Sequence, residues 1–167
     1  EIVFTDKVPE SFDDPKPMGG HLEGCRIGFD AGGSDRKVSA VIDGETVFSE
    51  EVVWLPKINP DPDYHYEGIV SALKKAAEHM PRVDAVGVSS AGIYINNRTM
   101  SASLFLKVPK DLYEEKAKDI YIRAIKDTFG DVPYAVANDG DVSALAGTMS
   151  LNDNNILGIA MGTSEAV

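Results

Sequence analysis

The order of apolar runs along the chain restricts the fold more than any other feature. Three short runs, at 26–29, 37–42 and 46–54, follow one another with only glycine-containing turns between them, at Gly32-Gly33 and Asp43-Gly44. Short apolar runs separated by tight turns predict consecutive antiparallel strands. The first third of the chain is therefore expected to form an antiparallel meander.

Helices and strands are expected to alternate after this meander. Apolar side chains at helical spacing predict one helix that follows Asp61 and stops at Pro81, and a second that begins at Asp111, with Glu114 completing a capping box, and ends at Gly130. Further strands are predicted at 83–89, 134–137 and 156–161, with a short helix at about 141–149. This order predicts an α/β fold: a mixed five-stranded sheet with helices on both faces.

Length and texture indicate one domain. A chain of 167 residues fits a single domain, since domains commonly have roughly 100–200 residues. Residues 1–24 contain three prolines and no periodic apolar pattern, so they are predicted to be an irregular extension, and residues 25–167 to be one lobe. Because the sequence begins with Glu1 and stops at Val167 directly after a turn-like segment, we expect it to be a piece of a longer protein.

Charge and residue types exclude several classes. The net charge is −11, from 16 basic and 27 acidic residues, and no basic stretch is interleaved with aromatics, so nucleic acid is not an expected partner. No run approaches the roughly 20 apolar residues that cross a bilayer, which predicts a cytoplasmic protein. Cys25, the only cysteine, allows no internal disulfide. His21, His65 and His79 lack paired ligand spacing and are expected at the surface, so no metal site is predicted from protein ligands alone.

Three polar segments are predicted at the ends of strands. They are Asp30-Ala31-Gly32-Gly33-Ser34, Asn138-Asp139-Gly140-Asp141 and Gly162-Thr163-Ser164. Glycines let backbone N–H groups approach a phosphate, a carboxylate can serve a magnesium ion through water, and a carboxylate at a rigid strand end can act as a general base. Each segment alone is also typical of a turn or a helix cap. Their shared place at strand ends, where ligands gather in open α/β sheets, favours a binding site.

On these motifs the sequence resembles the actin, hexokinase and heat-shock-protein 70 ATPase superfamily, and within it the ROK family of sugar kinases and repressors. The family's first phosphate loop, DxGGT, is matched by Asp30 to Ser34. Its substrate-and-base motif, ENDAN, is matched by Ala137 to Asp141, and its second phosphate loop by Gly162-Thr163-Ser164. The resemblance extends from about Arg26 to the last residue.

The resemblance implies an N-terminal actin-like ATPase lobe of a sugar kinase, with ATP, Mg²⁺ and a hexose or amino sugar as its small-molecule partners. The parent protein would have a second lobe and could form a homodimer, and the lobe alone would lack turnover. Asp139 would be the catalytic base, Asn138 would bind a sugar hydroxyl, and Asp30 would serve the magnesium ion. The resemblance implies phosphate contacts from Gly32, Gly33, Ser34, Gly162 and Thr163, and a substrate-side loop at Ser90, Ala91 and Gly92.

Departures from the family pattern leave two alternatives open. Ala137 stands where the family has a glutamate, Gly140-Asp141 where it has Ala-Asn, Ser164 where it has a glycine, and Asp35-Arg36 where a lysine often follows the first loop. One alternative is a non-kinase ATPase that resembles the activators of acyl-CoA dehydratases. The other is a sugar-sensing ROK repressor, whose DNA-binding helices would precede this lobe.

Overall fold

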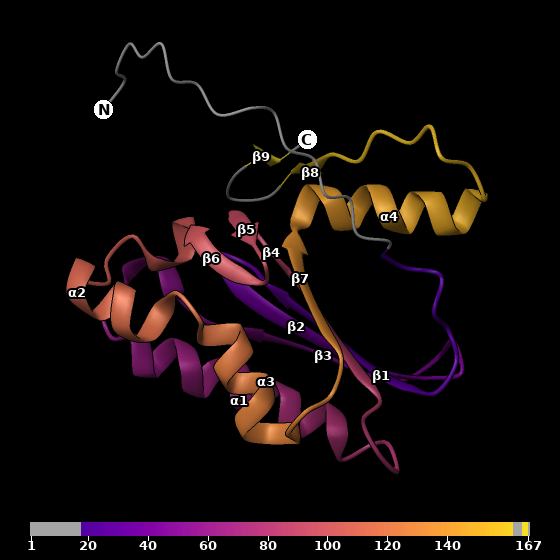
Figure 1. Ribbon diagram of the computed structural model, residues 1–167, viewed down its shortest axis with the longest axis horizontal. Helices are drawn as coiled ribbons and strands as arrows, with labels where there is room; N and C mark the ends of the chain where they lie inside the picture. The colour runs from indigo at the N-terminus through magenta and orange to yellow at the C-terminus, as the bar shows by residue number, and fades with distance from the viewer. Residues whose placement is uncertain (1–17, 162–164, 167) are drawn as a thin grey trace.

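The fold is built on one mixed sheet (Figure 1). The computed structural model describes residues 18–161 and the backbone of 165–166. The strands are β1 (Cys25–Ala31), β2 (Asp35–Ile42), β3 (Glu45–Val53), β4 (Ala85–Ser90) and β7 (Tyr134–Asn138). They lie in the order β3-β2-β1-β4-β7, with β1–β2 and β2–β3 antiparallel and β1–β4 and β4–β7 parallel. The predicted α/β fold, with its antiparallel meander and five-stranded sheet, is confirmed.

Helices α1 (Pro62–Ala77) and α3 (Ile120–Phe129) pack side by side on one face of the sheet, and α4 (Asp139–Leu151) lies over the other (Figure 1). We call these the first and the second face. Alternate residues of β1 point to the first face and are buried there, since side chains along a strand alternate between faces. The fully buried residues at its centre include Ile27, Phe29, Ile69, Leu73, Ile120 and Ile125.

Local signals place α1 as expected. Asp61 is its N-cap, and the Asp61 carboxylate accepts a hydrogen bond from the Asp63 N–H at 2.9 Å. Pro62 occupies the first turn, where its missing N–H costs nothing. Asp43 and Gly44 connect β2 to β3, and their φ angles of 50° and 85° are those of a two-residue hairpin turn.

The prediction of a single helix from Asp111 is wrong. Instead α2 (Lys110–Leu112), a π-helical turn η3 (Tyr113–Ala117) and α3 follow one another. No side-chain cap precedes α2, and the Glu114 carboxylate pairs with Lys118 at 2.8 Å rather than with the Asp111 backbone. The C-terminal end was predicted correctly, since Gly130 ends α3 with a φ of 74°.

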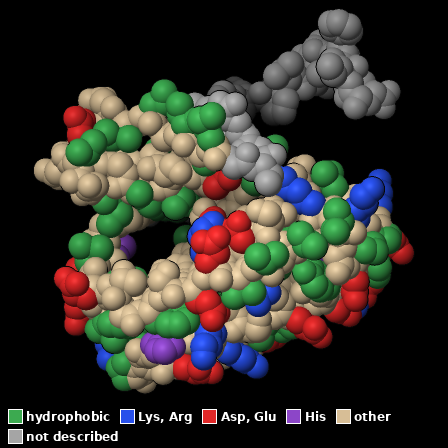
Figure 2. Space-filling view, turned by 180° about the vertical axis from the view of Figure 1, so that it is seen from behind, with side chains coloured by type: hydrophobic (Ala, Val, Ile, Leu, Met, Phe, Trp, Pro, Cys, Tyr) green, Lys and Arg blue, Asp and Glu red, His purple; other side chains and the backbone are tan. Residues whose placement is uncertain are grey.

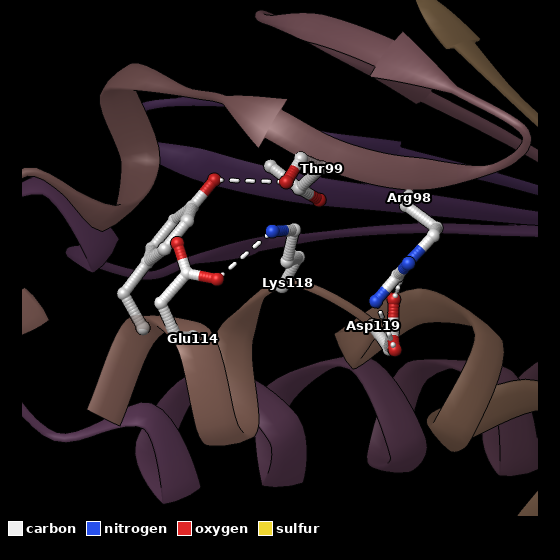
Figure 3. A network of polar contacts seen from close by, with 6 residues as sticks. Arg98, Thr99, Glu114, Lys118 and Asp119 are labelled. Atoms are coloured by element: carbon white, nitrogen blue, oxygen red, sulfur yellow. Dashed lines mark hydrogen bonds and ion pairs between the residues drawn. The ribbon is translucent and has the colours of Figure 1, made fainter. Parts of the chain in front are cut away.

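A small hairpin and two short turns were not predicted. Strands β5 (Ile93–Ile95) and β6 (Arg98–Ser101) form the hairpin, and the single helical turns are η1 (Pro56–Ile58) and η2 (Ser103–Phe105). Figure 3 shows how β6 is fixed to η3 and α3: Arg98 binds Asp119 through two hydrogen bonds of 2.6 and 3.1 Å, and the Tyr113 hydroxyl donates to the Thr99 carbonyl at 2.9 Å.

The strand predicted at 156–161 is also wrong. Only Ala160–Met161 (β8) is extended, and it pairs with Glu165–Ala166 (β9) rather than with the main sheet. Leu157 and Ile159 are exposed. The run therefore does not join the main sheet, although β7 forms an edge of that sheet.

The second face is only loosely covered. A cavity of about 810 Å³ lies between the sheet and α4, lined by strand residues and by Val142, Leu145 and Met149 of the helix. Figure 2 shows the corresponding opening between the upper part of the molecule, which holds α4, and the sheet below. None of the helices in the described part of the chain is long and apolar enough to cross a membrane.

Candidate active site

A cleft of about 520 Å³ lies at the carboxyl ends of the parallel strands. The strand register brings its parts together, because Asp30 of β1 pairs with Ser89 of β4, and Ser89 pairs with Ala137 of β7. Of the predicted site residues, Asp30, Gly32, Gly33, Ser34, Ala91 and Asp139 line this cleft. The predicted phosphate residues Gly162 and Thr163 lie outside the described residues.

The loop after β1 is held in place by Trp54, which follows β3. The Trp54 indole N–H donates to the Gly32 carbonyl at 2.8 Å, and the Trp54 backbone N–H donates to the Ser34 carbonyl at 3.1 Å. A Cβ atom at Gly32 would lie 2.7 Å from the Asp35 carbonyl oxygen, so only glycine fits. The loop is thus a rigid wall of the cleft.

Charges of both signs line the cleft. Lys37 on β2 lies opposite Asp30 in the sheet, and its ammonium group binds the Asp35 carboxylate at 2.6 Å. The hydrogen bond from Lys37 holds the pKa of Asp35 below its usual range, and the same bond raises the pKa of Lys37, with further contributions from the charges of Glu51 and Asp30. The Ser34 hydroxyl donates to Asp35 at 3.1 Å. The entrance to the loop therefore keeps one fixed cation beside two carboxylates.

Asp139 begins α4 directly after β7. Its half-buried carboxylate lines the cleft, and one oxygen accepts the Gly140 N–H at 3.2 Å. The N-terminus of a helix carries a partial positive charge that stabilises an anion. Asp139 is therefore a carboxylate held by a strand end on one side and a helix start on the other.

Asn138 is used as a structural residue. Its side-chain oxygen accepts the Gly140 N–H at 2.8 Å, which caps α4, and its amide nitrogen donates to the Gly92 carbonyl at 2.9 Å. Asn138 does not line the cleft. The cap interpretation of this position is thus correct for Asn138, whereas Asp139 next to it reaches the cleft.

The segment Ser90 to Gly92 reaches the cleft only at Ala91. The Ser90 side chain is fully buried; it accepts a hydrogen bond from the Tyr121 hydroxyl at 3.0 Å and lies 3.4 Å from the Ala31 carbonyl, to which it donates. Burial raises the pKa of the neighbouring Tyr94 to about 12, so this inner network is uncharged. The prediction that Ser90 contacts substrate is corrected, because its hydroxyl faces the protein interior.

Gly92 is required for backbone reasons. Its φ is 148°, and a Cβ atom there would lie 2.5 Å from the Ser101 carbonyl oxygen. Its carbonyl receives the Asn138 amide. Gly92 therefore connects the β5–β6 hairpin to the start of α4 and does not itself line the cleft.

Sequence analysis missed six polar residues that line the cleft. Asp35, Lys37 and Ser89 belong to the sheet, and the other three are Lys57 of η1, Ser103 of η2 and Ser143 of α4. The Ser103 hydroxyl oxygen is buried and has no hydrogen-bond partner among the described residues. No local pattern marks Lys57 or Ser103, because tertiary packing carries η1 and η2 to the cleft.

The donor set fits a magnesium ion. Among the residues that the structure describes, no group of three or more His, Cys, Asp or Glu could hold a metal. Magnesium, however, is commonly bound by one or two carboxylates together with substrate phosphates and waters. Asp30 supplies one such carboxylate beside the glycine loop of the cleft. This position suits an ion that arrives with a phosphate ligand.

Comparisons with known proteins agree with this geometry at the level of the fold. No protein-family model matches the chain, and no curated protein matches it in sequence. Solved structures with the same fold include the inorganic polyphosphate/ATP-glucomannokinase from Arthrobacter sp. strain KM (TM-score 0.61, 23% identity), the ROK hexokinase from Thermus thermophilus (0.54, 18%) and a glucokinase from Parabacteroides distasonis (0.53, 20%).

The coverage of these matches is partial. They include 86%, 74% and 73% of this chain but only 57%, 38% and 32% of the three kinases, so the chain spans less than two thirds of each. Partial coverage is consistent with an N-terminal lobe. The predicted resemblance to ROK-family sugar kinases is therefore confirmed as a shared actin-like fold.

Proposed function

We propose that the chain is the N-terminal lobe of an ATP-dependent sugar kinase, which transfers a phosphoryl group from ATP to a hydroxyl of a hexose or amino sugar. One observation carries the proposal: the glycine loop after β1 and the Asp139 carboxylate line the same cleft. A kinase needs a phosphate-binding loop and a base at such a distance that one substrate can reach both. Sugar-kinase neighbours of the same fold support this assignment.

The ATP phosphates would lie against the loop of Gly32, Gly33 and Ser34. Trp54 fixes this loop through two hydrogen bonds, so its backbone N–H groups need no rearrangement to meet a phosphate. Lys37, which lies opposite Asp30 in the sheet, adds positive charge to the same cleft. Asp30 would hold Mg²⁺ through water, and the ion would neutralise phosphate charge when it is bound.

Asp139 would act as the general base. The sugar hydroxyl oxygen forms a bond to the γ-phosphorus while the bond from that phosphorus to the β,γ-bridging oxygen breaks, and ADP leaves with the bonding pair. The hydroxyl proton passes to the Asp139 carboxylate. A carboxylate fixed at the junction of β7 and α4 can be held within hydrogen-bond reach of that hydroxyl.

The second half of the site would come from another lobe. The chain spans 32–57% of the length of the three kinases. Adenosine and most of the sugar would then bind outside these residues. We therefore expect the 167-residue chain alone to show no turnover.

One observation favours a second candidate, a hydrolytic ATPase of the same fold. Asn138, which would bind a sugar hydroxyl in the kinase, is engaged at both ends of its amide as a helix cap and a link to Gly92. A site without this sugar contact could instead activate water with Asp139. The two candidates differ in whether a sugar stimulates the release of ADP.

The test is ADP release by the full-length protein with Mg²⁺ and a panel of hexoses and N-acetylhexosamines. The kinase predicts sugar-stimulated release that falls at least about 100-fold in Asp139→Asn, the size typical of a lost general base. Asp141→Asn is the matched control, because Asp141 lies two residues further along α4, is exposed and does not line the cleft. Release that is independent of sugar would support the ATPase, and sugar-stimulated release that survives in Asp139→Asn would refute the role of this base.

A further inference from the structure

His65 is buried, contrary to the prediction from sequence that it lies at the surface. Its exposed fraction is 0%, and it lies in the first turn of α1, on the same side as Ile69 and Leu73. The spacing of four residues between these three positions is the signal that could have identified it as a residue of the buried face. A polar ring in such a place must find hydrogen-bond partners.

The partners of His65 are three backbone carbonyls from three different segments. Nδ1 lies 2.8 Å from the carbonyl oxygen of Asp61, the N-cap of α1. Nε2 lies 3.0 Å from the carbonyl oxygen of Pro56 in η1 and 3.3 Å from that of Leu104 in η2. Carbonyl oxygens only accept hydrogen bonds, and a neutral imidazole has one N–H to donate. With that proton on Nε2, the ring donates toward the carbonyls of both η1 and η2.

Aromatic rings fix the orientation of the imidazole. Trp54, Tyr64 and Phe105 surround it, with ring centroids 6.3, 5.7 and 5.1 Å away. The ring therefore has no room to turn its nitrogens away from the carbonyls. Its Nε2 side holds η1 and η2 together, which are in contact with each other.

The two turns that His65 joins carry side chains of the active cleft. Lys57 follows Pro56 in η1, and Ser103 precedes Leu104 in η2; both line the cleft. Neither turn belongs to the sheet, so strand hydrogen bonds do not fix its position. The His65 ring is thus the group through which the interior fixes this wall of the cleft.

We infer that His65 is a positioning residue for the acceptor-binding wall formed by η1 and η2, an inference that rests on the proposed kinase function. The wall is assigned to the sugar because the buried Ser103 hydroxyl has no hydrogen-bond partner among the described residues. A neutral hydroxyl of the sugar would supply that partner. The phosphate loop, by contrast, is fixed separately by Trp54. Loss of the His65 contact to η1 and η2 should weaken sugar binding without weakening ATP binding.

Two substitutions separate the two sides of the ring. Asparagine can place an amide nitrogen near the position of Nδ1 and so keeps the contact to Asp61, whereas glutamine can reach the position of Nε2 and keeps the contact to η1 and η2. In the full-length protein, His65→Asn should raise the KM for the sugar roughly tenfold, as expected for one buried hydrogen bond that is lost. His65→Gln should keep that KM within about threefold of the wild type, and the KM for ATP should stay within about twofold in both.

His79→Asn serves as the control for a histidine change just after the same helix, since His79 is exposed, stacks on Phe48 and does not line the cleft. Thermal unfolding of every variant shows whether a change is only structural. If both His65 variants lose stability and neither changes the sugar KM, or if both raise it equally, the positioning role is refuted. If His65→Asn does not fold, His65→Gln alone provides the test. A large rise of the sugar KM in folded His65→Gln would then refute the positioning role. A wild type that phosphorylates no sugar overturns the proposed function, and the positioning role with it.

Discussion

The two faces of the same sheet are covered in different ways. On the first face, α1 and α3 bury Ile69, Leu73, Ile120 and Ile125 to an exposed fraction of 0%. On the second face, Gly140 is the only buried residue of α4, and Leu145 and Met149 line a cavity of about 810 Å³ between the helix and the sheet. The first face is thus the close-packed core of the described residues, and the second face is more open.

This difference also separates the supports of the candidate active site. Asp30 and the glycine loop are fixed by β1, β2 and Trp54, which belong to the well-packed part of the molecule. Asp139 stands at the start of α4 and is fixed chiefly by the end of β7 and by the Asn138 cap. We therefore expect substitutions on the first face to change mainly stability. Substitutions at the glycine loop and at the start of α4 should change mainly catalysis.

The largest expected effect comes from a matched pair of leucines. Leu73→Ala removes a fully buried side chain of α1 from the first face, whereas Leu145→Ala shortens a half-buried side chain of α4 beside the cavity. Leu73→Ala should cost about 2–5 kcal/mol of unfolding free energy, because the substitution leaves a cavity in a close-packed core. Leu145→Ala should cost less than about 1 kcal/mol, because little packing is lost. Urea unfolding of the 167-residue chain measures both.

Equal costs for the two leucines would contradict the comparison. They would mean that α4 closes onto the sheet in solution and that the second face is a core of its own. Repeating the pair in the full-length protein sharpens the result, since a larger cost of Leu145→Ala there than in the 167-residue chain would locate further protein against α4.

The sequence predicted the strands of the main sheet and helices α1 and α4 well, and it failed at the helix from Asp111 and at the run 156–161. Periodicity alone identified β1, β2, β3, β4 and α1, because their side chains alternate between a dry core and water. The run at 156–161 is equally apolar, but its last two residues pair with 165–166 instead of with the main sheet, and sequence does not contain that information. The capping signal at Asp111 misled for a related reason, since the carboxylate of Glu114 found Lys118 instead.

The candidate site was predictable only where it follows strand ends. Asp30, Gly32 and Asp139 were found because a motif directly follows a strand, and the sheet register then brings the strand ends together. Ser103 and His65 were not, since their roles depend on how η1 and η2 pack. Among the described residues, the motif positions were thus predicted better than the side-chain directions, as the buried hydroxyl of Ser90 shows.

A smaller effect is expected from the residue that connects the first face to the site. Trp54→Phe keeps an aromatic ring in the core but removes the N–H that donates to the Gly32 carbonyl at 2.8 Å. The change should cost about 1–3 kcal/mol, the usual range for a buried carbonyl left without its donor. In the full-length protein the KM for ATP should rise while the KM for the sugar changes little. A rise in the sugar KM alone would contradict the assignment of this loop to phosphate.

The smallest expected effect belongs to Asp84, which lies outside both faces at the amino end of β4. Its carboxylate accepts hydrogen bonds from Arg82 at 2.7 Å and from the Cys25 N–H at 2.8 Å. These bonds, with that from Arg82 the strongest cause, hold the pKa of Asp84 below its ordinary value of 3.8. A carboxyl whose pKa is lower in the folded state stabilises the fold above its unfolded pKa and loses that contribution as the pH falls through the folded pKa.

Asp84→Asn should therefore destabilise the protein slightly at neutral pH and progressively less below about pH 4, because protonation removes the charge from the wild type as well. Urea midpoints of wild type and variant, measured from neutral to acidic pH, should converge. Because Arg82 is the main partner, Arg82→Gln should shrink the pH-dependent part of this difference. If the difference instead keeps its full size in the Arg82→Gln background, the Cys25 N–H rather than the ion pair stabilises the carboxylate, and the start of β1 depends on a backbone contact that salt does not screen.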